Sequence, residues 1–144
     1  MDVLSLSTSR VNNKIAWYEN DGNGNFSEQR IISSQANNAQ SVYATDLDGD
    51  GDMDVLSASN ADHKIAWYEN DGNGNFSDRM IISSQARGAQ SVYASDLDED
   101  GDMDVLSTSF WDGKIAWYEN DGNGNFSKQM ICLLYTSPSP RDRG

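Results

Sequence analysis

The chain has 144 residues, of which 37% are hydrophobic and 10% aromatic, so a single domain with an apolar core is possible. Its net charge of -13 argues against a nucleic-acid partner, because no basic cluster is available to contact phosphates. No apolar run approaches the ~20 residues that a membrane-spanning helix requires.

The chain repeats itself about every 50 residues. KIAWYENDGNGNFS begins at Lys14, Lys64 and Lys114, and a segment of the form SVYA-(T/S)-DLD-x-DGDMDVLS begins at Ser41 and Ser91. A period of this length is typical of architectures in which one supersecondary unit buries its apolar face against copies of itself. We therefore expect function to be delivered by an array of similar sites.

The first copy of the unit is incomplete. Its opening residues, Met1–Ser5, match Met53–Ser57 and Met103–Ser107, which lie in the middle of the later copies. We interpret Met1 as an internal methionine and expect the chain to begin partway through a unit, so the lack of a visible signal sequence is uninformative. The segment that follows is two residues longer than its counterparts, which predicts either a longer loop near Arg10–Asn13 or a misread beginning of the sequence.

Each complete unit contains four segments with the composition of β-strands. In the copy bounded on both sides they are Ala39–Asp46, Asp54–Ser59, Lys64–Asn70 and Phe76–Ser83. They are rich in Val, Ile, Tyr, Trp, Ser and Thr and are bounded by Gly, Asn and Asp. The third segment is apolar on both faces, which suits a sheet packed between two neighbours. The connection Asn70–Asn75 is dense in residues that tolerate positive φ, so we predict a hairpin there.

Four antiparallel strands in each unit predict the blades of a β-propeller, since a β-helix would have a much shorter period. We predict an all-β fold, namely a partial β-propeller of about 2.75 four-stranded antiparallel blades. The propeller is expected to occupy residues 1–131, with blades at about 1–35 (incomplete), 36–85 and 86–131. Because propellers close with about four to eight blades, the chain should be part of a ring or self-associate to complete one.

Two nine-residue stretches concentrate the acidic residues, with five carboxylates in Asp46–Asp54 and six in Asp96–Asp104. Both read D-x-D-x-D-G-x-x-D, a spacing that turns alternate carboxylates inward while the glycine permits a sharp bend. Ca²⁺ takes about six to eight oxygen ligands, whereas Mg²⁺ demands octahedral geometry and dehydrates reluctantly, so we predict two calcium sites. The predicted ligands are Asp46, Asp48, Asp50, Asp52 (carbonyl) and Asp54, and Asp96, Asp98, Asp100, Asp102 (carbonyl) and Asp104.

Other interpretations of the polar loops are weaker. Ser57 and Ser107 stand where an EF-hand has its last Glu, and no helix flanks the loops, which argues against an EF-hand. An acidic surface turn is the alternative, although carboxylates this close repel strongly without a cation. Asp2 would be the last ligand of a third loop whose other ligands are missing, so we predict no competent site there. The connection between the third and fourth strands offers a further candidate metal site, although a hairpin turn is the simpler interpretation, at Asp21, Asn23, Asn25 and their copies.

The acidic loop, followed by D-V-L-S and a W-Y-E-N-D-G-N-G-x-F hairpin, resembles FG-GAP/VCBS repeats over about Met1–Ile131. The resemblance implies an integrin-α-like propeller with Ca²⁺ in the loops between the first two strands of each blade, on the ligand positions given above. The sequence motifs F-G and G-A-P are themselves absent, so the chain resembles the VCBS-like branch of the family more closely. The family also implies export or cell-surface display, with adhesion or ligand binding.

We therefore expect a non-enzymatic, calcium-binding module of an extracellular or cell-surface adhesion or ligand-binding protein. The alternative is a non-catalytic accessory propeller of a secreted, polysaccharide-acting enzyme, or a lectin. The chain has no GxSxG, P-loop or His/Cys metal cluster. His63 is a lone histidine without the partners that a general base needs.

The copies differ from one another mainly in connections that an up-and-down blade places opposite the acidic loops. These are Arg10–Asn13, Asn60–His63, Phe110–Gly113, Ala36–Asn38 and Ala86–Gly88. We hypothesise that this face recognises a protein or glycan, with Phe110 and Trp111 as the candidate contacts. Unconstrained drift is the alternative. A sugar-stacking ladder is a tempting second candidate, but identical strand contexts favour packing between blades for Trp17, Trp67, Trp117, Tyr18, Tyr68 and Tyr118.

The last segment, residues 132–144, leaves the register of the repeat and contains both prolines and the single cysteine of the chain. It resembles the translation of a sequencing-library adapter, and we predict that it is an artefact outside the fold. A Pro/Ser linker to another domain is the alternative. We give Cys132 no redox role, and a single cysteine excludes an internal disulfide.

Overall fold

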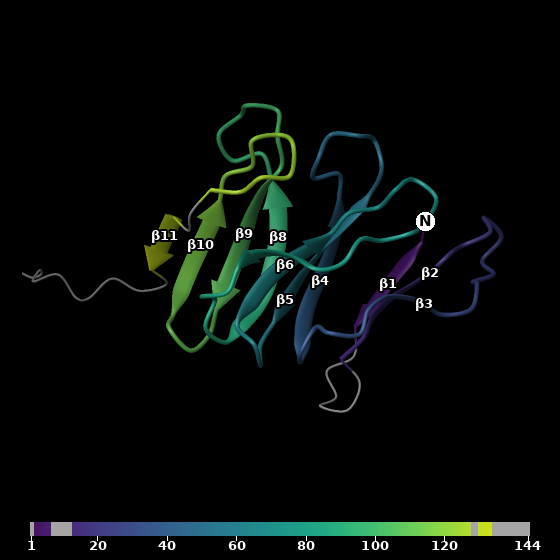
Figure 1. The fold of residues 1–144 in the computed structure, drawn as a ribbon, viewed down its shortest axis with the longest axis horizontal. Helices are drawn as coiled ribbons and strands as arrows, with labels where there is room; N and C mark the ends of the chain where they lie inside the picture. The colour runs from purple at the N-terminus through teal and green to yellow at the C-terminus, as the bar shows by residue number, and fades with distance from the viewer. Residues whose placement is uncertain (1, 7–12, 128–129, 134–144) are drawn as a thin grey trace, which may run out of the picture.

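A computed structural model describes residues 2–6, 13–127 and 130–133. Within them, three antiparallel sheets stand side by side (Figure 1). The N-terminal sheet contains β1 (Val3–Leu6), β2 (Ile15–Tyr18) and β3 (Arg30–Ser33). The middle sheet contains β4 (Ala39–Thr45), β5 (Asp54–Ser59), β6 (Lys64–Tyr68) and β7 (Met80–Ser83). The third sheet contains β8 (Ala89–Ser95), β9 (Asp104–Ser109), β10 (Lys114–Tyr118) and β11 (Met130–Leu133).

Strands that follow one another in sequence are neighbours in every sheet, as in propeller blades. The described residues contain no helix, so none of them forms the long apolar helix that spans a bilayer. The prediction of an all-β partial propeller is confirmed. The division of the chain at residue 131 stays a prediction: β11 includes Cys132 and Leu133, and the rest of the predicted tail lies outside the described residues.

The strands of the middle sheet lie where the sequence predicts them; β5 has the predicted bounds, whereas β4, β6 and β7 are shorter at the end that carries the acidic loop. The third strand of the middle sheet stops at Tyr68, because the next residues enter a tight hairpin. In that hairpin the amide of Asp71 donates to the carbonyl of Asn75 at 3.0 Å, and a lone bridge pairs Asn70 with Phe76. The polar hairpin therefore replaces the strand extension that the pattern predicted.

The core lies between the sheets, as an array of stacked blades requires. Trp67 on β6 is 4% exposed and packs among Leu56, Ala94 and Val105 of its own and the next sheet. Tyr68, the next residue, points the other way and is fully buried with Ile15 of the first sheet. The prediction that these aromatic side chains pack between blades is confirmed for this pair.

The third sheet contributes a glycine and an aromatic ring to the Trp67 contact. Phe126 meets Trp67 edge to face, with 6.3 Å between ring centroids. Gly124 has φ +85°, and a Cβ built there would lie 2.6 Å from Cζ2 of Trp67. A side chain at this position would therefore clash, and the hairpin can close over the indole only as glycine.

The loops gather at two opposite ends of the sheets (Figure 1). One end carries the acidic loops between first and second strands and the hairpins that follow the third strands. The other end carries the variable connections, tied to one another by backbone hydrogen bonds such as Phe110 N to Gly88 O (2.9 Å) and Ala86 N to His63 O (3.1 Å). Of the predicted longer loop at Arg10–Asn13, only Asn13 lies within the described residues.

Candidate metal centres

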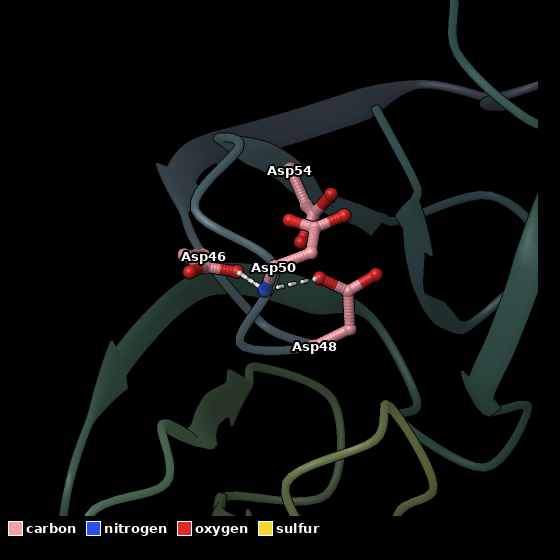
Figure 2. A group of neighbouring side chains, drawn as sticks. All are labelled: Asp46, Asp48, Asp50 and Asp54. Atoms are coloured by element: carbon pink, nitrogen blue, oxygen red, sulfur yellow. Dashed lines mark hydrogen bonds between the residues drawn. The ribbon is translucent and has the colours of Figure 1, made fainter. Parts of the chain in front are cut away.

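Each acidic loop brings four carboxylates together. In the first loop Asp46, Asp48, Asp50 and Asp54 each offer an oxygen within 4.8 Å of the others, and Figure 2 shows Asp48, Asp50 and Asp54 turned toward one another. The second loop repeats the arrangement with Asp96, Asp98, Asp100 and Asp104. Eight of the ten predicted ligand residues thus lie in two compact groups of hard oxygen donors.

The carboxylate of Asp46 shapes the loop from inside. Its oxygens accept hydrogen bonds from the amides of Gly49 (2.9 Å), Asp50 (3.2 Å) and Gly51 (2.9 Å) (Figure 2 draws the bond from Asp50). These bonds wrap the backbone around one side chain, as short polar residues do in turns. The spacing of the acidic motif is therefore the spacing of a turn that closes on its first residue.

Asp54 anchors the loop to the rest of the blade. It opens β5, it is fully buried, and its two oxygens accept from Leu47 N and from Asn70 N, both at 2.9 Å. Burial raises the pKa of Asp54, while the bonds from Asn70 and Leu47 oppose that shift. Asp104 is held in the same way by Leu97 and Asn120. The acidic loop and the neighbouring hairpin are thus joined through a single carboxylate.

Each group is electrostatically crowded. Desolvation raises the pKa of Asp48 to about 7, assisted by a hydrogen bond to the side chain of Glu69 and by the charges of Asp54 and Asp50. Two carboxyl groups can share a hydrogen bond only when one of them holds a proton. A cation placed among these oxygens would take over the role of that proton. The donor set fits a hard divalent ion on these grounds.

Glu69 and its counterpart Glu119 also lie beside the acidic loops, and neither is among the residues predicted from the sequence. Desolvation raises the pKa of Asp98 to about 7 as well, and its hydrogen bond to Glu119 is the next cause. The available signal was the Glu in every copy of WYEND. In the first sheet the counterpart, Glu19, instead forms an ion pair with Arg30 at 2.9 Å.

The side chain of Asp52 stands apart from the group. A Cβ added at Gly72 (φ +91°) would lie 2.8 Å from Oδ2 of Asp52, so this carboxylate rests against the adjacent hairpin. Asp102 lies in the same way against Gly122, and burial together with Asp100 raises its pKa. The predicted ligand role of the Asp52 and Asp102 carbonyl oxygens stays a prediction.

The carboxylates of the hairpins accept hydrogen bonds from residues of the turns in which they lie. The oxygens of Asp71 accept from Asn73 N, Asn75 N and Asn75 Nδ2 at 2.8–3.2 Å, and these bonds lower the pKa of Asp71, the side chain of Asn75 most strongly. Asp21 and Asp121 are bonded alike. Within the described residues they join no metal-ligating group, which favours the hairpin interpretation, and Asp2 joins none either.

The opposite end of the sheets carries a cluster of aromatic rings. Trp111 is 60% exposed and packs on Gly88, while His63 meets it edge to face with 4.9 Å between centroids. Nδ1 of His63 accepts from Gly88 N at 3.1 Å, which fixes the imidazole. Phe110 is 75% exposed beside them. Three variable connections therefore meet in one aromatic surface.

The repeats of the chain match those of a known protein family. The family described as FG-GAP-like repeat matches residues 1–57, 46–107 and 96–141. No curated protein sequence matches the chain. Among solved structures, a lectin of Agrocybe aegerita, described for its recognition of non-reducing terminal N-acetylglucosamine, superposes with a TM-score of 0.61 at 20% identity. The match covers 99% of this chain and 40% of the lectin, so the chain spans less than half the length of that relative.

Proposed function

The chain belongs to the FG-GAP-like repeat family, and from that premise we propose that it is a non-catalytic, calcium-binding propeller module that recognises a ligand outside the cell. The single observation that carries the proposal is the pair of four-carboxylate groups, each with oxygens within 4.8 Å. Both stand at the same place in successive blades, so they form one kind of site used twice.

Calcium is the ion that suits these donors. The groups consist of oxygen ligands on a flexible loop, which Ca²⁺ accepts more readily than Mg²⁺, and they contain no sulfur or imidazole ligand for a transition metal. The proposed ligands are the carboxylates of each group with the carbonyl oxygens of Asp52 and Asp102. The bound ion would neutralise the crowded carboxylates, and extracellular calcium is abundant enough for such sites, which supports an exported or cell-surface location.

Residues of the acidic loop hold the proposed site in place through hydrogen bonds. Asp46 holds the loop through backbone amides, and Asp54 ties it to the hairpin that lies over Trp17 of the preceding blade. A cation that fixes the loop would stiffen the contact between blades. Calcium would act as a structural element, leaving the opposite end free to vary.

The aromatic surface of Phe110, Trp111 and His63 is the proposed ligand-binding region. Exposed aromatic rings stack on sugar faces and anchor protein partners. The fold is similar to that of a lectin at 20% identity. For this reason a glycan is the first candidate ligand to test. A lectin-like role is therefore the form of ligand binding that we place first.

Calorimetric titration of the whole chain with Ca²⁺ tests the metal sites. We expect two binding sites, and one site each in Asp50→Asn and Asp100→Asn. The amide oxygen can still accept the bond from the residue two positions on, which Asp50 accepts from Asp52 N at 2.9 Å. Asp78→Asn removes the same charge from an exposed position and should leave both sites intact. Absence of binding at millimolar Ca²⁺ would refute the proposal.

A glycan array tests the ligand surface. Binding should be lost when Phe110 and Trp111 are both replaced by Ser. Phe26→Ser is the matched control, since Phe26 is 50% exposed but lies in the hairpin at the acidic end. Equal loss in both variants would show that the aromatic surface is not the site, and the array would then redirect the search to proteins.

A further inference from the structure

His63, which lies just before β6, has a backbone conformation that favours glycine. Its φ is +61°, in the left-handed region that side chains other than glycine rarely adopt. The residue at the same place before β10 is Gly113, with φ +62°. Backbone strain of this kind is retained where the side chain that causes it has a role. The histidine side chain therefore contributes something that the glycine of the next blade does not.

The imidazole of His63 contacts the connection that leads into the third sheet. Nδ1 accepts from the amide of Gly88 at 3.1 Å, and Gly88, which lies just before β8, is buried. A ring nitrogen that accepts a hydrogen bond carries no hydrogen, so the neutral imidazole has its hydrogen on Nε2. The bond thus fixes the orientation of the ring, and it makes Nε2 a hydrogen-bond donor.

Trp111 completes the contact from a third connection. Its ring meets that of His63 edge to face, with 4.9 Å between centroids. A Cβ built on Gly88 would lie 2.6 Å from Cγ and Cδ1 of Trp111, so the indole lies against this glycine. The amide of Trp111 donates to the carbonyl of Arg87 at 3.2 Å, which joins the same two connections through the backbone. A side chain at residue 88 would therefore displace the indole.

The junction between the N-terminal and middle sheets has different residues at the same three places. There Asn13 stands in place of the histidine, Asn38 in place of the glycine and Ala61 in place of the tryptophan. The backbone is the same, because Ala61 N donates to Asn37 O at 3.2 Å, as the tryptophan does one blade further on. Asn38 has φ +54°, so this backbone does not by itself require a glycine. The glycine makes room for the indole, and the differences between the junctions form one set, which independent drift does not explain.

The exposure of the indole is a property of its place in the blade. Trp111 is 60% exposed, and its counterpart Ala61 is exposed although a further blade follows it. Phe110 differs, because its counterpart Asn60 donates to Ala89 O of the next sheet at 3.5 Å. Trp111 is therefore the ring whose exposure does not depend on whether another blade follows.

We propose that His63 determines the specificity of the proposed ligand region, and that the region binds a single sugar ring. The apolar face of the sugar rests on the indole of Trp111, and a hydroxyl or carbonyl oxygen of the sugar accepts from Nε2 of His63. Gly88 is a positioning residue for both rings. Trp111 is the one tryptophan outside the repeated KIAWYEN segments, so the chain has one such site. This inference rests on the proposed ligand binding and narrows it to a pyranose with an acceptor oxygen beside its apolar face.

Titration of the whole chain with methyl pyranosides, followed by nuclear magnetic resonance, tests the donor. The panel contains glucose, galactose, mannose and their N-acetylhexosamines, together with the monodeoxy forms of the sugar that binds most tightly. We expect one monodeoxy form to bind about tenfold more weakly, because it lacks the oxygen that accepts from His63. In His63→Asn the parent sugar should lose the same factor, and that monodeoxy form should lose nothing further. The carboxamide oxygen can still accept from Gly88 N, so this variant removes the Nε2 donor and keeps the tie between the connections.

Exchanging residues between the two junctions tests the indole. Gly88→Asn installs the residue of the preceding junction and should abolish binding, because its side chain would displace Trp111. Asn38→Gly is the matched control, and it should leave the affinity unchanged. Binding retained in Gly88→Asn, or a deoxy penalty that persists in His63→Asn, would overturn this inference while glycan binding by the chain stands. If no sugar of the panel binds, the inference fails together with the proposed glycan ligand.

Discussion

The carboxyl group of Asp48 is hydrogen-bonded to the carboxyl group of Glu69, although the two residues lie on different loops of the same blade. Asp98 and Glu119 repeat the contact in the next blade. Such a pair is stable only with a proton or a cation between its oxygens. A cation held by the acidic loop would also stabilise this pair, so we propose that Glu69 contributes to the metal site.

Replacing Glu69 by Gln should weaken Ca²⁺ binding at the first loop by on the order of tenfold, about 1.4 kcal/mol, because the site loses one formal charge. Binding at the second loop should be unchanged. Glu19→Gln is the matched control, since Glu19 occupies the same place in the first sheet but pairs with Arg30. Calorimetric titration measures both, and unchanged affinity in Glu69→Gln would remove this residue from the site.

Metal-free protein should lose stability as the pH rises from 5 to 8. The folded-state pKa of Asp48 and of Asp98, about 7, exceeds the ordinary value of 3.8, so the native state binds these protons more tightly than the unfolded state. Their contribution is complete below 3.8 and is lost as the pH passes through 7. Urea unfolding in EDTA at both pH values measures the trend.

Saturating Ca²⁺ should abolish that decline, because the cation takes the place of the protons. The carboxylates with lowered pKa, such as Asp71, lose their contribution only on acidification below about 4, so they do not affect this window. Stability in EDTA that increases between pH 5 and 8 would contradict the assignment of raised pKa values.

Glu99→Gly should stabilise the metal-free protein by about 0.5–1 kcal/mol. Glu99 has φ +60°, in the left-handed region that favours glycine, and its counterpart in the first loop is Gly49 with φ +75°. Urea unfolding in EDTA measures the gain. Glu99→Gln removes the charge but keeps the side chain, so a gain of equal size in that variant would assign the effect to repulsion and not to the backbone.

Gly124→Ala should destabilise the protein more than Gly24→Ala does, by about 1–3 kcal/mol. Both glycines have φ +85° and occupy the same place in their hairpins. An added Cβ would contact Trp67 at 2.6 Å in the first case and would find open space in the second. Thermal or urea unfolding of the two variants isolates the contact between blades, and equal losses would show that the backbone conformation alone sets the cost.

The sequence by itself determined the strand order, the number of blades and eight of the grouped carboxylates. These features depend on the spacing of residues within one repeat unit, and the chain contains that unit nearly three times. A turn that closes on Asp46 requires amides only three to five residues away, so its geometry is local. Alternating apolar residues and glycine-rich hairpins are local signals as well.

Only the tertiary structure decided which residues meet across loops and blades. The contact of Glu69 with Asp48, the burial of Leu47 beside Asn120 and the edge-to-face contact of His63 with Trp111 join residues that no periodic pattern relates. Leu47 and Leu97 occupy the same position in the repeated D-L-D motif, yet Leu47 is 1% exposed and Leu97 is 43% exposed. The difference arises because burial depends on the neighbouring sheet, which a repeat cannot encode in its own residues.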